Sequence, residues 1–200
     1  MIPKTIEQLV EEHRLFQLKA EAQAAAGPGR GRYVPSIGQA GARVAVVGFC
    51  PPPKETQAFS GIIGEMLDSC SVPPQWLFKT YLVRRRPASV KTLAKALLVW
   101  TPLLMEELAI VRPNAVILLG PFTARAVLGT NECETEKLRK TRFVLKNSMP
   151  ETNFFVTFSP EEVCGSGGLD GNKGQYWHFD YMAVFEGITK YFNTTRIIEA

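Results

Sequence analysis

The sequence predicts an α/β protein, a three-layer αβα sandwich around a central, mostly parallel sheet of about four strands. Short apolar runs rich in β-branched residues, typical of strands that helices cover on both faces, alternate with segments of helical periodicity. The two clearest runs, at residues 44–47 and 115–119, both pass through a glycine into a helical pattern. With 200 residues and 46% hydrophobic content, the chain suits one compact domain.

The N-terminal part is predicted to be a helix followed by a loop. Thr5 and Gln8 form a capping box and apolar residues then recur at helical spacing, so we expect an amphipathic helix over residues 4–25, packed on the main body. Glycine and proline crowd the next segment, which is typical of a loop or tether. The chain therefore divides into an N-terminal helix (1–26), a Gly/Pro-rich loop (27–42) and one domain (43–195).

The first strand leads into a segment where a ligand site is expected. The run at 44–47 breaks at Gly48 into a loop with three successive prolines, and helical spacing resumes after Phe59. Because proline has a fixed φ angle, this loop starts out stiff. Ligands of open α/β sheets usually bind at the carboxyl ends of strands, so the segment suits a preorganised pocket, although an ordinary strand-to-helix connection also fits it.

The later elements repeat this alternation. The further expected strands are 76–83, 115–119, 143–145 and 153–157, and the further expected helices are 89–111, with a kink or break at Pro102, 120–128 and 176–188. A loop is expected at 158–161 and a flexible Gly-rich segment at 164–174. A doubly wound nucleotide-binding fold is the alternative, but no GxGxxG follows the first strand.

Charge and hydropathy place the chain among cytoplasmic proteins. No run approaches the roughly 18 uncharged apolar residues of a membrane span. Residues 1–26 carry four glutamates, which argues against a secretory or transit peptide. A net charge of +4 is compatible with a polyanionic partner without requiring one.

Six motifs occur in order between residues 46 and 180: VVGFCPP, AFSGIIGEML, TYLVRRRP, RPNAVILLGPFTARAVLG, TFSPEEV and WHFD. Together they resemble the uracil-DNA glycosylase superfamily, most nearly its bacterial and archaeal family 4 and 5 branches. The family counterparts are VVGEAPG, PFVGxAGxLL, TNVVKCRP, the segment around KPKVIVALGxxA, the THPS-type DNA-inserting motif and the end of the last helix. The resemblance implies the sandwich fold, DNA as the partner and flipping of a base out of the helix.

The functional positions of that family are changed here. Phe49 stands where the family carries its water-activating acid, and Cys50 follows where other branches have Asp or Asn. Tyr81 replaces the asparagine that reads uracil, and Ser159 replaces the histidine that stabilises the departing base. Uracil specificity should therefore be lost.

No metal or cofactor is expected. The resemblance to family 4 implies an iron–sulfur cluster, but Arg85 and Trp100 stand where two of its cysteines belong and the N-terminal pair is missing. The chain's own cysteines show no CxxC spacing and are expected to be free thiols. They are Cys50, Cys70, Cys133 and Cys164.

The predicted base pocket combines Phe49, Phe59 and Tyr81. Phe59 is placed to be the floor on which a base stacks, with a core position at a helix start as its other interpretation. Tyr81 brings a bulky ring with one hydroxyl. The pocket either recognises a different base, such as a bulky modified one, or is filled by Tyr81 and closed.

Water activation requires a general base near the sugar. Glu55 on the proline loop is the first candidate, and Cys50, Glu161 and Glu162 are others. Cys50 is also a possible nucleophile, although an inert buried thiol is the more usual state after a core strand. Ser159 is expected to donate a hydrogen bond to a leaving base or a phosphate.

The predicted DNA contacts are Arg84, Arg85 and Arg86, which suit phosphates, and Phe158 and Pro160, which suit a wedge that fills the gap left by a flipped base. A second basic cluster is expected to be a solvated face. It comprises Lys137, Arg139, Lys140 and Arg142.

These expectations describe a monomeric, cytoplasmic DNA-binding protein. Its predicted reaction is hydrolysis of the N-glycosidic bond of a non-uracil, bulky modified base, which leaves an abasic site. DNA repair and defence against viruses with modified DNA are two settings for it. The alternative is a catalytically inactive superfamily member that acts as a DNA- or protein-binding accessory factor.

Overall fold

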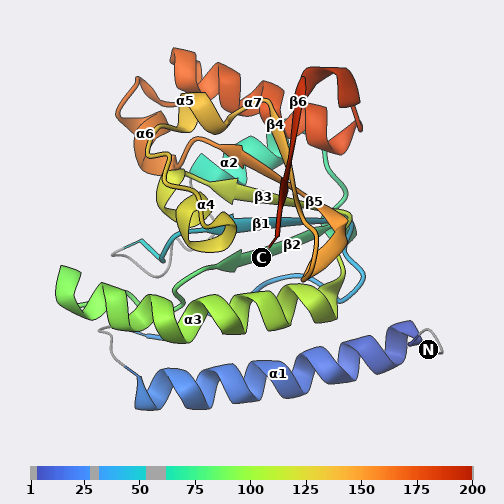
Figure 1. Cartoon of the computed structure of the whole chain (residues 1–200), viewed down its shortest axis with the longest axis vertical. Coiled ribbons are helices and arrows are strands. Elements are labelled where there is room, and N and C mark those ends of the chain that lie inside the picture. Colours follow the sequence, from blue (N-terminus) through green and yellow to red (C-terminus); the bar gives the residue numbers. More distant parts are fainter. Residues whose placement is uncertain (1–3, 28–31, 53–61, 200) are drawn as a thin grey trace.

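The computed structural model describes residues 4–27, 32–52 and 62–199. At its centre is a six-stranded sheet of order β2-β1-β3-β5-β4-β6 (Figure 1). The strands are β1 (Val44–Gly48), β2 (Leu77–Tyr81), β3 (Ala115–Leu119), β4 (Thr141–Leu145), β5 (Met149–Thr157) and β6 (Thr194–Ile198). The first four strands in the spatial order are parallel, β4 is antiparallel to β5, and β6 is parallel to β4.

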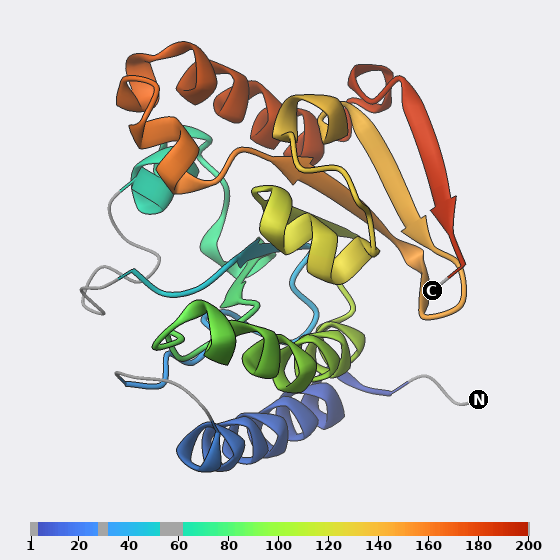
Figure 2. The same ribbon diagram turned by 60° about the vertical axis from the view of Figure 1, so that its left-hand side comes forward.

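Helices cover both faces of this sheet (Figures 1 and 2). The α-helices are α1 (Ile6–Ala26), α2 (Ile62–Ser69), α3 (Val90–Val111), α4 (Pro121–Leu128), α5 (Thr135–Leu138), α6 (Pro160–Cys164) and α7 (Asn172–Phe185). Short 3₁₀ turns lie at Pro74–Trp76, Gly168–Asp170 and Thr189–Tyr191. The predicted αβα sandwich with a mostly parallel sheet is confirmed.

Alternate residues along a strand point to opposite faces of the sheet, so their side chains belong to two separate hydrophobic cores, one on each face. In β1, Ala45 and Val47 pack with α1, α3 and α4, whereas Val44 and Val46 pack with α2, α6 and α7. All five residues of β1 are buried, and so are all five of β3. Burial on both faces explains why these strands are continuous apolar runs in the sequence.

The helix α1 lies along α3, on the side away from the sheet (Figures 1 and 2). The expected capping box is present, because Thr5 accepts a hydrogen bond from the amide of Gln8 and Gln8 accepts one from the amide of Thr5. Phe16, Ala20 and Ala24 are buried in the same core as α3. The apolar stripe of α1 therefore attaches it to the domain.

Several predicted details are wrong. The sheet has six strands rather than about four, and β6 was not expected because most of its side chains are exposed. Pro102 lies inside the continuous helix α3. Residues 158–161 were expected as a loop, but α6 already begins at Pro160. In the Gly-rich segment 164–174, a 3₁₀ turn lies at Gly168–Asp170 and α7 begins at Asn172, while the predicted flexibility stays a prediction.

Among the helices described, none combines the length and the apolar character needed to cross a membrane.

Candidate functional site

The carboxyl ends of four parallel strands meet at one edge of the sheet. The connections after β1, β2, β3 and β5 are held together there by backbone hydrogen bonds: the Leu82 amide donates to Gly48 at 2.8 Å, and the Gly120 amide donates to Thr157 at 2.8 Å. Every predicted site residue in the described part of the chain lies on one of these connections or at a strand end. The segments that carry these residues therefore meet at one edge of the sheet, the edge at which ligands of open α/β sheets usually bind.

Cys50, in the connection after β1, lies within electrostatic reach of Arg86, in the connection after β2, and of Glu161, in α6. Burial raises the pKa of the Cys50 thiol, the Arg86 guanidinium lowers it, and the Glu161 carboxylate raises it. The net result is a raised pKa, so the thiol stays protonated and is a poor nucleophile at neutral pH. Arg86 and Glu161 are both exposed and thus open to a ligand.

The three consecutive arginines have three different environments. Arg84 is buried, with 2% of its surface exposed, and pairs with Glu107 of α3. Arg85 donates to the carbonyl of Ala24 at the end of α1, at 2.8 Å. Arg86 donates to the carbonyl of Pro51 at 3.0 Å, which ties the connection after β2 to the one after β1. The prediction that Arg84 contacts phosphate is wrong, because its side chain is enclosed and neutralised.

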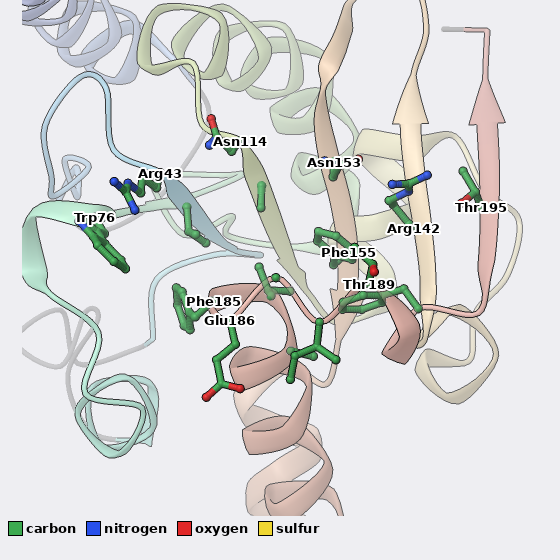
Figure 3. A pocket seen from close by; sticks show the side chains of 17 residues that line it. Arg43, Trp76, Asn114, Arg142, Asn153, Phe155, Phe185, Glu186, Thr189 and Thr195 are labelled. Carbon is green, nitrogen blue, oxygen red and sulfur yellow. The ribbon is translucent and has the colours of Figure 1, made fainter.

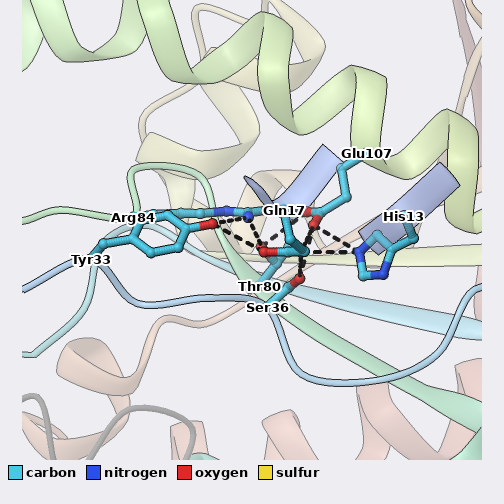
Figure 4. A network of polar contacts seen from close by, with 7 residues as sticks. All are labelled: His13, Gln17, Tyr33, Ser36, Thr80, Arg84 and Glu107. Atoms are coloured by element: carbon cyan, nitrogen blue, oxygen red, sulfur yellow. Dashed lines mark hydrogen bonds and ion pairs between the residues drawn. The ribbon is translucent and has the colours of Figure 1, made fainter. Parts of the chain in front are cut away.

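Glu107 is the centre of a buried polar network (Figure 4). Its two carboxylate oxygens interact with Arg84 and with Thr80 at 3.3 Å, Gln17 at 2.7 Å, Ser36 at 2.8 Å and His13 at 3.1 Å. Tyr33 joins by accepting from Arg84 at 2.9 Å. The network links α1, the segment before β1, β2 and α3.

Ionisation of Glu107 depends on that network. Burial raises the pKa of its carboxyl, but the Arg84 guanidinium and hydrogen bonds from His13, Arg84 and Ser36 lower it more, so the pKa lies below the ordinary value. Glu107 is therefore charged at neutral pH. A buried charge pair of this kind is costly to break because either partner alone is left uncompensated.

Tyr81 lies at the end of β2 with 4% of its surface exposed. Its ring packs directly over Gly48, where an added Cβ would come within 2.7 Å of two ring carbons, and it forms a small buried cluster with Val34. The ring thus occupies space beside the end of β1. Of the two predictions for this residue, this packing favours the one in which Tyr81 itself fills the space.

Ser159 caps α6. Its hydroxyl accepts from the amide of Glu162 at 3.3 Å, and the Glu162 carboxylate accepts from the Ser159 amide at 2.7 Å and from Thr135 at 2.9 Å. Pro160 is the first helical residue and is half-buried. Both Ser159 and Glu162 are therefore engaged in holding the helix start, and Glu161 is left exposed between Pro160 and Glu162.

Phe158 is a core residue with 1% of its surface exposed. It packs in the cluster beneath α7, and the guanidinium of Arg139 lies 5.0 Å from its ring centre. The prediction of a DNA-inserting wedge at Phe158 is wrong in this conformation, because its position at the end of β5 directs it into the helix layer.

Phe49 packs toward α3 and α4. Its ring centre is 5.7 Å from that of Phe122, and the two rings line an apolar groove with Leu97 and Leu98. Phe122 and Leu98 are largely exposed, at 68% and 79%. Glu55 and Phe59, the predicted general base and stacking floor, lie outside the described residues.

Sequence reasoning missed two buried carboxylates. Glu107 interrupts the apolar stripe of α3, and that interruption was the available signal. Asp180 is held by Arg139 at 2.7 Å, by Thr157 at 2.5 Å and by Tyr191 at 2.6 Å. The expectation that Arg139 belongs to a solvated basic face is therefore wrong. Its side chain instead ties the end of α5 to α7.

All four cysteines are free thiols, as expected. Within the described ranges, no three His, Cys, Asp or Glu side chains form a group that could hold a metal ion. No known family model matches the chain, and no curated protein sequence matches it either.

Proposed function

We propose that the carboxyl edge of the sheet binds DNA, accepts an unstacked non-uracil base and hydrolyses its N-glycosidic bond to leave an abasic site. The proximity of Arg86 and of Glu161 to Cys50 supports this proposal most directly. It places an exposed cation that suits a phosphate and an exposed carboxylate of α6 near the same thiol. The order of six sequence motifs provides the reason to consider DNA as the partner.

The proposed reaction uses a carboxylate as the general base. Glu161 accepts a proton from a water molecule while the water oxygen attacks the sugar carbon C1′. The bond between C1′ and the base nitrogen breaks, its electron pair leaves with the base, and the base is protonated afterwards. Glu55 on the proline loop is the second candidate for the same proton transfer.

Arg86 serves as a phosphate contact in this proposal. An arginine fork matches a phosphate in two parallel hydrogen bonds and fixes the protein on the backbone without reading sequence. The bond from Arg86 to the Pro51 carbonyl holds the guanidinium beside the β1 connection. DNA bound there would present its sugar next to Cys50 and Glu161.

Two observations favour a second candidate, a DNA- or protein-binding accessory factor without catalysis. The pKa of Cys50 is raised, so its thiol is a poor nucleophile, and Tyr81 packs over Gly48, where it occupies space that a flipped base would need. An accessory factor that binds DNA would share DNA binding, but not excision, with the hydrolase.

Excision assays separate the two candidates. Purified protein is incubated with uracil-containing DNA and, separately, with heavily modified viral DNA, and alkaline cleavage then reveals abasic sites. We expect breaks only in the modified DNA. Retained DNA binding with no breaks in any substrate would overturn the hydrolase and leave the accessory factor.

Two variants assign the general base. If Glu161 is the base, Glu161→Gln lowers the excision rate about 100-fold or more. The matched control is Glu151→Gln, an exposed glutamate near the other end of β5. A loss confined to Glu55→Gln would move the assignment to the proline loop.

A further inference from the structure

A cavity of about 460 Å³ lies at the end of the sheet opposite the predicted site. Val44 and Ala115 line it at the amino ends of β1 and β3, and Asn153 of β5, which pairs with Ala115, lines it beside them (Figure 3). The connection from α7 to β6, with Glu186 and Phe192 among its lining residues, borders the other side. This volume is within the range of cavities that bind small molecules.

The floor of the cavity is aromatic. Phe155 of β5 and Phe192 pack with ring centres 4.2 Å apart, and Phe185 and Trp76 also line the cavity. Aromatic surfaces of this kind accept the flat face of a heterocyclic ring. The floor therefore suits a ligand with an apolar or aromatic part.

Arg142 of β4 brings an unpartnered donor to this floor. The pairing of Phe143 with Phe154 places Arg142 beside Phe155 on the same face of the sheet. The Nε atom of Arg142 is buried and has no hydrogen-bond partner among the residues that the structure describes. A buried donor without an acceptor is unfavourable, and a bound anion would satisfy it.

Arg43 lies on the other side of the cavity. Its guanidinium carbon is 4.2 Å from the centre of the Trp76 ring, and in the described residues no hydrogen bond or ion pair reaches the guanidinium. Figure 3 shows Arg43 with Trp76 on one side and Arg142 on the other. Three strand spacings separate the two backbones, about 14 Å, which leaves room for one extended small molecule.

Polar side chains complete the wall. The amides of Asn114 and Asn153 and the hydroxyls of Thr189 and Thr195 line the cavity and can donate to or accept from a ligand. Glu186 is the lining carboxylate, and Figure 3 shows its carboxylate directed away from both arginines. Of the described residues, no carboxylate that lines the cavity pairs with Arg43 or Arg142, so the cavity presents two cations.

From this arrangement we propose that the cavity binds a nucleoside monophosphate. The phosphate accepts hydrogen bonds from Arg142 and from the hydroxyls of Thr189 and Thr195. The base lies over the aromatic floor and stacks on the guanidinium plane of Arg43, as bases do on arginine. The amides of Asn114 and Asn153 pair with the edge of the base. This site is separate from the carboxyl edge and does not depend on the excision proposal.

Intrinsic tryptophan fluorescence tests the proposal on the whole chain. Trp100 and Trp177 are buried, whereas Trp76 is partly exposed and lines the cavity, so a bound base should quench Trp76. We expect saturable quenching by a panel of nucleoside monophosphates and much weaker binding of the nucleosides and of inorganic phosphate. Quenching should disappear in Trp76→Phe, in which calorimetry measures the remaining binding. Absence of saturable binding at millimolar concentration would overturn the proposal.

Substitutions locate the site. Arg142→Met removes the donors and keeps the apolar stem, and we expect it to weaken binding about tenfold or more, because charge-assisted hydrogen bonds are lost. Arg196→Gln is the matched control, since Arg196 is an exposed arginine of β6 that does not line the cavity.

Other results would contradict the proposal. Undiminished binding by Arg142→Met, or equal binding of phosphate and nucleoside monophosphate, would contradict the assigned ligand. If Arg142→Met does not fold, Arg43→Gln carries the same test. Because excision is assayed separately, failure here leaves the carboxyl-edge proposal untouched.

Discussion

The two ends of the parallel strands differ in how their polar side chains are partnered. At the carboxyl edge, Arg84 is paired with Glu107 and the Ser159 hydroxyl caps α6. At the amino edge, Arg43 and Arg142 face a cavity, and within the described part of the chain the Nε of Arg142 has no hydrogen-bond partner. The edge that the motifs point to therefore uses many of its polar groups to hold loops in place, while the other edge leaves donors open.

This difference shows that the role of a charged residue, structural or binding, can be inferred only when its interaction partner is known. Arg84 and Arg86 are two positions apart, yet the first is enclosed and the second is exposed. Function at the carboxyl edge must therefore come from the few groups that remain open, of which Arg86 and Glu161 are the charged ones near Cys50. Substitutions at each edge should separate structural from binding roles.

The largest effect is expected at the buried pair. Glu107→Gln leaves the Arg84 guanidinium buried without a counter-charge, so we expect a loss of about 3–5 kcal/mol in the free energy of unfolding, measured by urea denaturation. The double variant Arg84→Met with Glu107→Leu removes both charges and should recover part of the loss. A loss below about 1 kcal/mol in the single variant would show that the network contributes little.

Acid should weaken the same network. Because the pKa of Glu107 is lower in the folded chain than its ordinary value of 4.5, its charge stabilises the fold above pH 4.5. That contribution is lost as the pH falls below 4.5 and through the lowered pKa. The difference in unfolding free energy between wild type and Glu107→Gln should shrink over this range, and a constant difference would contradict the assignment.

The next prediction concerns the contact between Gly48 and the Tyr81 ring at the carboxyl edge. Gly48→Ala places a methyl group against the Tyr81 ring, and we expect a loss of about 1–3 kcal/mol because the buried ring has to shift. The same substitution in a Tyr81→Ala background should cost less, since the clash is removed. Equal costs in both backgrounds would mean that the ring does not fill this space.

The sequence alone was enough to predict the elements whose pattern lies in residues close together in the chain. Strands covered on both faces, such as β1 and β3, are continuous apolar runs, and the capping box of α1 depends on residues three positions apart. β6 has an exposed side-chain pattern and gives no such signal. The burial and pairing of Arg84 could not be predicted, because its partner, Glu107, is 23 residues away and the contact depends on how α3 packs.

A smaller effect is expected at the cap of α6. Ser159→Ala removes the acceptor for the Glu162 amide, so we expect a loss of about 1 kcal/mol in the free energy of unfolding. Ser159→Asn keeps a capping oxygen and should be close to wild type. If Ser159→Asn restored stability but excision stayed low, the hydroxyl would have a role in the reaction beyond the cap.

The smallest effect on stability is expected at Arg86. Its side chain is exposed and its hydrogen bond goes to a single carbonyl, so Arg86→Gln should change the free energy of unfolding by no more than about 0.5 kcal/mol. DNA binding should nevertheless weaken, and the slope of log affinity against log salt should fall by about 1, as expected for one lost phosphate contact. Arg196→Gln, an exposed arginine of β6, should leave both the affinity and the slope unchanged. Equal losses in the two variants would mean that net charge, rather than the carboxyl edge, determines DNA binding.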